Sequence, residues 1–343
     1  MTSAITVSLA APTRGAAEAR EPRVARDVRL PTIRIVLRVL VALAIVCAVG
    51  FALASRWAQV QPELARANPL VLLAALVAVV VALQLAMMSW RVLLAGLGSP
   101  LTGAAARRIF FVGQLGKYLP GSVWPVLVQM DMGRRHGVPA SRMAVSFFVS
   151  LGLSVLTGTV LGAPVLVLAG ENLIWLRWPA VAVAVVGAVV LLWPPALNRL
   201  LVMGLRVLRR PPLERHLTGA TVARATLLMV GTWGFFGLAL WFLAVDLGAD
   251  PRAALPVSVS GYALAYTAGL LFILAPAGVG VRDVLLMVTL APVLGGAPAT
   301  AVALLSRLVA TAADIGVALW AIGSHRTNAH IDRRFDQPDG ARS

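Results

Sequence analysis

Long apolar segments recur along this chain of 343 residues, and they constrain its fold more than any other feature. Each is close to the roughly 20 apolar residues that an α-helix needs to cross a bilayer. In the hydrocarbon core only helices and closed barrels satisfy their own backbone hydrogen bonds. The sequence therefore predicts an all-α polytopic integral membrane helical bundle with about six full spans. These spans are 36–55, 69–90, 143–169, 177–195, 223–246 and 299–323.

The composition argues against a soluble protein. Apolar residues make up 59% of the chain and charged residues 13%, which would leave too much apolar surface in water. The net charge of +16 would suggest a nucleic-acid partner in a soluble protein. Here the arginines fall mainly in short loops between apolar segments, where they orient the chain in a bilayer and attract anionic head groups. We therefore expect membrane lipids, and no nucleic acid, as partners.

Two further apolar runs, 109–129 and 256–296, are broken at their centres by proline and glycine. Backbone that leaves the helix inside a membrane is tolerated only where protein or a water-filled cavity covers it, so such breaks point to a binding site. A cation lies beside each break: Lys117, the only lysine of the chain, and Arg282. The residues expected to shape the backbone of the breaks are Gly116, Pro120, Gly121, Pro276, Gly278 and Gly280.

The distribution of basic residues favours a re-entrant hairpin for the first broken run. Arg107 and Arg108 precede this run and three arginines follow it, so a hairpin that enters and leaves on one side keeps them all in the cytoplasm. Three spans separate the two runs, which gives a second hairpin the opposite orientation, as in an inverted repeat. The alternative is that 256–276 and 281–296 each span fully. The second arm is short and contains Pro292, which favours the hairpin.

The chain divides into a membrane domain, 35–323, and two tails. The tail 1–34 is rich in arginine and lacks an apolar core, so we expect it to be disordered. The apolar segment that follows has no convincing cleavage site, so we expect no cleaved signal peptide. The second tail is 324–343. We expect both termini in the cytoplasm and the protein in the plasma membrane as a multi-pass protein.

Five charged side chains fall within the apolar runs and spans and away from the ends of the spans: Lys117, Arg282, Asp283, Arg307 and Asp314. A charge at mid-membrane costs about 2.5–3.5 kcal/mol, so some of these groups must pair, hydrate or lie near the surface. Arg307 and Asp314 are seven residues apart on one helix, hence on one face about 10 Å apart, too far for a reliable direct pair. Arg282 and Asp283 are neighbours and their side chains diverge.

The sequence leaves the roles of these charges open. Lys117 is either a cation at a hairpin tip that meets a lipid phosphate or an interfacial lysine. Arg282 is either a binding group or a cytoplasmic anchor. Asp314 is either a structural partner of Arg307 or Arg282, or a directly functional group.

Other polar residues give weaker indications. Ser146, Ser150, Ser154 and Thr157 recur at helical spacing along one face of the span 143–169, a pattern that more often means close helix packing than substrate lining. The four histidines lie in loops or a tail without metal-ligand spacing. No catalytic triad order, Walker loop or nucleotide fingerprint occurs. We therefore predict no metal, no cofactor and no catalytic residue, and we do not expect an enzyme.

Several motifs give the chain a family resemblance. They are GKYLPGSVWP at 116–125 with the stretch 129–137, PAGVGVRD at 276–283 and SRLVATAAD at 306–314. Through these residues the chain resembles the membrane domain of the lysylphosphatidylglycerol synthase/flippase family over about residues 35–323. The resemblance implies movement of an aminoacylated phosphatidylglycerol, or a related anionic or polyprenyl lipid, between leaflets. The family's amino-acid transfer belongs to a separate soluble domain, which we do not expect in this chain because it ends soon after the last span.

The leading hypothesis is a flippase-like protein that translocates or binds an anionic phospholipid or a polyprenyl-phosphate lipid. One alternative is a membrane-embedded transferase that uses lipid-linked donors, with Asp314 or Asp283 as base. Another is a non-catalytic scaffold for an envelope complex. All three hypotheses are compatible with a homo-oligomer or with a protein partner in envelope biogenesis. The predicted substrate-binding residues are Gln114, Lys117, Tyr118, Arg282, Asp283, Arg307 and Asp314.

Overall fold

The computed structural model describes residues 66–118, 123–168, 217–271 and 280–335. In the last of these ranges the side chains are described as far as residue 324. Residues 61–62 and scattered positions between 178 and 203 are also described. No strand occurs in these described parts, and the predicted all-α class is confirmed. Other predictions fall on residues outside the described ones. These are the tail 1–34, residues 336–343 of the other tail, the span 36–55, most of the span 177–195, and the break residues Pro120, Gly121, Pro276 and Gly278.

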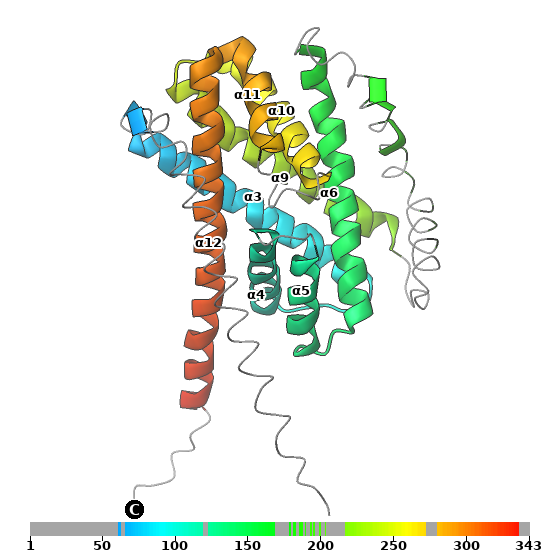
Figure 1. Ribbon diagram of the computed structural model, residues 1–343. Coiled ribbons are helices and arrows are strands. Elements are labelled where there is room, and N and C mark those ends of the chain that lie inside the picture. The colour runs from blue at the N-terminus through cyan, green and yellow to red at the C-terminus, as the bar shows by residue number, and fades with distance from the viewer. Residues whose placement is uncertain are drawn as a thin grey trace, which may run out of the picture. The chain divides into compact units, whose positions relative to one another are not determined.

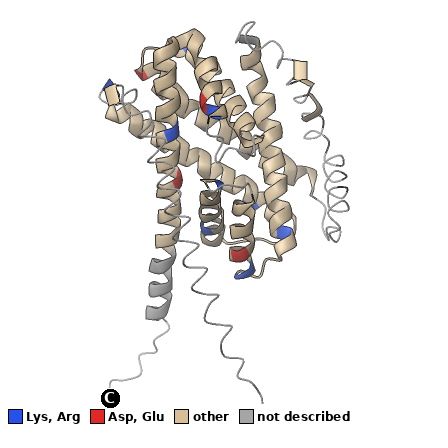
Figure 2. Cartoon of the chain, viewed as in Figure 1, with Lys and Arg blue, Asp and Glu red and all other residues tan. Residues whose placement is uncertain are grey.

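Five helices of the described part are long and apolar enough to cross a membrane. They are α3 (Pro69–Gly96), α6 (Ala140–Leu168), α9 (Gly219–Asp246), α10 (Pro251–Leu271) and α12 (Gly296–Phe335). Figure 1 shows them as the long ribbons of the bundle, and Figure 2 shows that charged residues are sparse along them. Four predicted spans are thereby confirmed, and α10 is a fifth long helix, from within the second broken run.

Local signals fix where these helices begin. The side chain of Asn68 accepts a hydrogen bond from the backbone N–H of Leu70 at 2.9 Å, and Pro69 occupies the first helical position of α3. Thr218 caps α9 in the same way through the N–H of Thr221. Such caps satisfy donors that the first turn leaves free, so the polar residue just before each apolar segment sets the start of the helix.

The first broken run folds as a short helical hairpin. It consists of α4 (Gly103–Gln114), the 3-10 turn η1 (Leu115–Tyr118) and α5 (Trp124–Arg134). Helices of 12 and 11 residues are about 16–18 Å long, far short of the roughly 30 Å hydrocarbon core. The two helices pack against each other (Figure 1). The predicted break at Lys117 is confirmed.

The glycine in this turn is required by a close approach of backbone. A Cβ atom on Gly116 would lie 2.8 Å from the backbone nitrogen of Pro125 and 2.9 Å from the carbonyl carbon of Trp124. Backbone cannot move aside as the end of a flexible side chain can. The start of α5 therefore rests directly on η1, and this contact holds Lys117 beside the second arm.

The second broken run has two unequal arms. Its first arm, α10, has 21 residues and is about 31 Å long, whereas α11 (Val281–Leu294) has 14 residues and is about 21 Å long. The second run is therefore neither a pair of short arms nor a pair of full-length spans. Gly280, with φ of +88°, precedes α11, and its N–H donates to the carboxylate of Asp283 at 3.1 Å. The inverted repeat stays a prediction.

Polar side chains join the long helices inside the bundle. The Ser89 hydroxyl of α3 donates to the carbonyl of Ala225 on α9 at 2.9 Å. The indole N–H of Trp90 donates to Ser146 on α6 at 3.2 Å, and that of Trp233 on α9 donates to Thr157 at 2.9 Å. Ser146 and Thr157 therefore serve helix packing, as their pattern suggested.

Two glycines let α10 approach its neighbours at backbone distance. A Cβ on Gly237 of α9 would lie 2.5 Å from the Cα of Val259, and a Cβ on Gly162 of α6 would lie 2.8 Å from the backbone nitrogen of Leu264. Small residues at such crossings allow close packing where lipid gives no hydrophobic drive for helix association. Helix α10 is thus held from two sides.

We predict that Gly237→Ala destabilises the protein, because the added methyl group meets the backbone of α10. Overpacking of this kind costs about 1–3 kcal/mol. Gly234→Ala on the same helix is the matched control, because nothing lies within 4 Å of its Cβ position. Thermal unfolding of the purified variants in detergent measures the difference. Equal midpoints for the two variants would show that the crossing is looser than described.

Candidate functional site

A cavity of about 800 Å³ lies among the helices of the bundle. Residues from all the long helices and from α4, η1, α5 and α11 line it, and most of them are apolar. Its polar side chains include Lys117, Tyr118, Arg282 and Asp314. A largely apolar cavity of this size with a few convergent polar groups is typical of a small-molecule or head-group site.

Lys117 and Asp314 form an ion pair at the wall of this cavity. The Lys117 Nζ lies 2.6 Å from Oδ2 of Asp314, and the side chains are 22% and 5% exposed. The hydroxyl of Tyr118 donates to the same carboxylate oxygen at 2.6 Å. The 3-10 turn that interrupts the first broken run is therefore tied to α12 by two adjacent side chains. Lys117 is paired with a carboxylate of the protein itself.

A second ion pair joins α12 to the second broken run. Nη1 of Arg307 donates to both carboxylate oxygens of Asp283, at 3.0 and 2.9 Å. Asp283 also accepts a hydrogen bond from the backbone N–H of Gly280. Its carboxylate therefore both caps α11 and neutralises Arg307. Asp283 itself does not line the cavity, whereas Arg307 does.

Arg282 sits against an aromatic wall. Its Nη2 donates to the hydroxyl of Tyr262 at 2.7 Å, and its guanidinium carbon lies 4.6 and 5.4 Å from the ring centroids of Tyr262 and Tyr266. Tyr262 stacks in turn on Phe236, with centroids 4.9 Å apart. The residue is only 8% exposed. Among the described residues it makes no ion pair, so the cation–π contacts stabilise this charge without neutralising it.

The charges at the cavity therefore do not balance. Lys117, Arg282 and Arg307 are cationic, whereas Asp314 and the Asp283 behind Arg307 are the carboxylates that neutralise two of them. The break segments 119–122 and 272–279, which lie outside the described residues, contain no charged residue in the sequence. Within the described part of the site the excess is one positive charge, and it belongs to Arg282.

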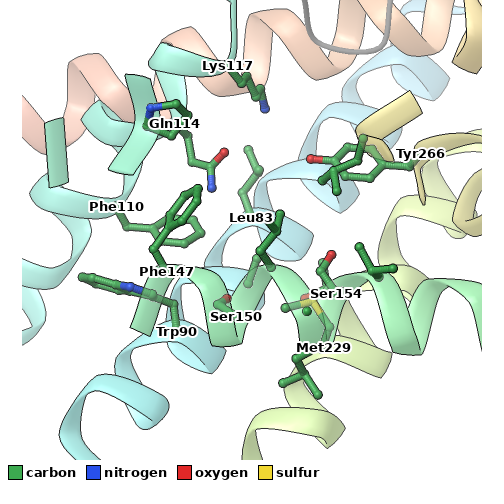
Figure 3. Close-up of a pocket in the computed structure, with 18 of the residues that line it drawn as sticks. Leu83, Trp90, Phe110, Gln114, Lys117, Phe147, Ser150, Ser154, Met229 and Tyr266 are labelled. Atoms are coloured by element: carbon green, nitrogen blue, oxygen red, sulfur yellow. The ribbon is translucent and has the colours of Figure 1, made fainter. Parts of the chain in front are cut away.

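Most of the predicted site residues come together here. The structure places Gln114, Lys117, Tyr118, Arg282, Arg307 and Asp314 on the cavity wall. Figure 3 shows the side chains of Lys117, Gln114 and Tyr266 around one space above α6. The proposal that Asp314 pairs with Arg307 or Arg282 was wrong, because η1 brings Lys117 to it instead. Lys117 and Arg282 both line the cavity, which argues against the alternatives of an interfacial lysine and a cytoplasmic anchor.

Other residues of the cavity were not predicted from the sequence. Tyr262 and Tyr266 were not singled out, although the chain has only three tyrosines and all three line the cavity. Their rarity and their spacing of four residues were available signals. Ser150 and Ser154 also line the cavity, so the serine face of α6 serves both packing and lining. Gln129 of α5 is a further lining residue.

The described residues contain no group of three or more histidine, cysteine, aspartate or glutamate side chains that could hold a metal ion. Chemically, the arrangement offers one uncompensated guanidinium, several hydroxyl and amide groups, and an apolar surround. These groups have the chemistry that an anion attached to an apolar body requires.

Comparison with known proteins identifies the family of the chain. The family model of the lysylphosphatidylglycerol synthase transmembrane region matches residues 35–317. The chain belongs to this family and is a multi-pass membrane protein. No curated protein matches the chain.

We predict that Asp314→Asn destabilises the protein by about 3–5 kcal/mol, because it leaves the Lys117 ammonium inside the bundle without its counter-charge. Lys117→Met together with Asp314→Leu should recover most of this loss. The exposed pair Arg135 and Asp131 is the control, since its side chains are 66% and 58% exposed and its loss should cost less than about 1 kcal/mol. Unfolding midpoints of the single and double variants give the coupling. Additive effects at Lys117 and Asp314 would contradict the pairing.

Proposed function

We propose that this member of the family binds an anionic lipid in the cavity, with the lipid phosphate at Arg282, and carries its head group between the leaflets. The observation that supports the proposal is that, within the part of the site that the structure describes, Arg282 is the one cation without a counter-charge. The lipid tails stay in the bilayer while the head group crosses within the protein. We place the protein in the plasma membrane with both termini in the cytoplasm.

The geometry of Arg282 suits a phosphate. A guanidinium carries five N–H donors in a planar fork and often binds a phosphate through two of them. Among the described residues, one of these donors has a partner, the hydroxyl of Tyr262. The remaining donors are available to phosphate oxygens, while the tyrosine rings keep the plane of the guanidinium fixed.

Charge balance favours a lipid with one net negative charge. A phosphodiester head group would bring the described site from an excess of one positive charge to neutrality. A lipid with a net positive head group would instead raise the excess in a medium of low dielectric constant, where like charges repel strongly. The proposed cargo is therefore an anionic phospholipid, or a polyprenyl-phosphate lipid whose phosphate is a diester.

The surroundings of the site suit a lipid rather than a free anion. Apolar side chains such as Phe110, Phe147 and Trp233 line the cavity beside the charged groups. Large apolar side chains also cover the outside of the bundle, where Leu73, Leu227 and others are more than half exposed. A guest with an anionic end and an apolar end would find a matching surface at each end.

The carboxylates leave little support for the transferase alternative. Asp283 is held by Arg307 and by the N–H of Gly280, and Asp314 by Lys117 and Tyr118. A general base needs a carboxylate that can reach and accept a substrate proton. Both groups are instead engaged in joining helices, so the proposal gives them a structural role.

We predict that Arg282→Gln weakens binding of phosphatidylglycerol by roughly 10-fold or more, because hydrogen bonds to charged groups contribute about 1.5–3 kcal/mol. Translocation of fluorescent phosphatidylglycerol in proteoliposomes should fall in parallel. Arg135→Gln, in an exposed pair, is the control and should leave both unchanged. Thermal unfolding of each variant separates lost binding from lost fold.

Binding and translocation assays of the wild-type protein test the proposed function directly. If it neither binds nor translocates any of a series of anionic phospholipids and polyprenyl phosphates, the proposed function is wrong. If Arg282→Gln folds and transports as well as the wild type, the phosphate is bound elsewhere.

A further inference from the structure

Gln129 is a buried amide without a protein partner in the wall of the cavity. It lies on α5, its exposed fraction is 0%, and it lines the cavity. Neither its nitrogen nor its oxygen has a hydrogen-bond partner among the described residues. A buried amide that uses neither its donors nor its acceptor lowers stability, so such a group in a native protein calls for a ligand or water.

The fold makes room for this amide. Gly113 of α4 faces Gln129, and a Cβ atom at Gly113 would lie only 2.6 Å from Cγ of Gln129. Any larger residue at 113 would push the side chain of Gln129 away from its present position. The two short helices of the first broken run are therefore shaped around an uncharged polar group that bonds to nothing in the described protein.

We propose that Gln129 is a ligand-binding residue whose amide, enclosed by its neighbours in the present arrangement, turns into the cavity and hydrogen-bonds a hydroxyl group of the lipid head group. This inference rests on the proposed function and specifies its cargo as a phosphodiester lipid with a hydroxyl-bearing head group. Ser150 and Ser154 of α6 line the same cavity (Figure 3) and extend the uncharged polar surface.

The chemistry of the amide distinguishes a hydroxyl from the other head-group types. A hydroxyl both donates and accepts, so it can satisfy the carbonyl and the NH₂ group of one amide. A phosphate oxygen only accepts hydrogen bonds and would leave the side-chain carbonyl of Gln129 without a donor. An ammonium group only donates, and it would add a positive charge to a site that already has one in excess.

The test compares two lipids that differ in this one feature. Phosphatidylglycerol and phosphatidylethanol are both phosphodiesters with one negative charge, and only the first carries hydroxyls. Titration of the purified wild-type protein by native mass spectrometry should show about three- to tenfold tighter binding of phosphatidylglycerol, the range expected for about one net hydrogen bond. Phosphatidylethanolamine should bind more weakly than either. Equal binding of the first two lipids by the wild type would overturn the inference.

The variants assign the preference to Gln129. Gln129→Leu should abolish the preference by weakening phosphatidylglycerol alone, and Gly113→Ala should reduce it by displacing the amide. Ser258→Ala is the matched control, because its hydroxyl is also buried and without a partner among the described residues but does not line the cavity. A preference that survives in Gln129→Leu would overturn the assignment. Binding of phosphatidylethanol by the same variant verifies that it is folded, and if it does not fold, the wild-type comparison decides.

A second comparison distinguishes hydroxyl-bearing phospholipids from hydroxyl-bearing polyprenyl lipids. A polyprenyl phosphoglucose and the ethyl ester of the same polyprenyl phosphate are both phosphodiesters with one negative charge, and only the first has a hydroxyl-bearing head group. The pair that shows the larger Gln129-dependent preference identifies the source. Wild-type protein that binds both members of each pair equally, with both dependent on Arg282, would leave the proposed function standing and refute only this inference. Protein that binds none of these lipids would refute both.

Discussion

Helix α12 holds both interrupted segments of the chain in place through buried charge. Asp314 binds the Lys117 ammonium of η1, and two turns earlier on the same helix Arg307 binds the Asp283 carboxylate of α11. The two pairs have opposite polarity, so each interrupted segment is matched to one position along α12. Turns in broken helices have few backbone hydrogen bonds of their own, and these side chains supply part of the order that the backbone lacks. The geometry of the cavity depends on this arrangement.

The same arrangement separates structural charge from binding charge. Because four of the five charges that the described residues place at or behind the cavity wall neutralise one another in pairs, the electrostatic requirement of this part of the cavity falls on Arg282. Its neighbours are tyrosines, which stabilise a cation but do not cancel it. A site built in this way has its anion-binding capacity in one residue and its uncharged polar surface elsewhere. The charge of Arg282 and the uncharged polar groups can then recognise different parts of one lipid head group.

The sequence predicted the elements of the site better than their connections. Hydropathy located the four predicted spans that the structure describes, and the Pro-Gly breaks pointed to Lys117 and Arg282, because these features depend on local composition. The partner of Asp314 could not be derived, since it depends on how η1 and α12 are rotated relative to each other. The unequal arms of the second broken run were also missed, because the continuous apolar run around Pro256 does not reveal where its first helix begins. Gln129 resembles any polar residue of a short helix until its lack of partners is known.

The glycine crossings of α10 have a thermodynamic consequence for the aromatic wall. Main-chain atoms of α10 touch α9 at Gly237 and α6 at Gly162, so sliding or rolling of this helix would drive backbone into backbone. Tyr262 and Tyr266 belong to α10, which these backbone contacts hold in position, and the guanidinium of Arg282 packs against their rings. Little conformational entropy remains to be lost when a guest arrives. Affinity can then come from a modest number of polar contacts.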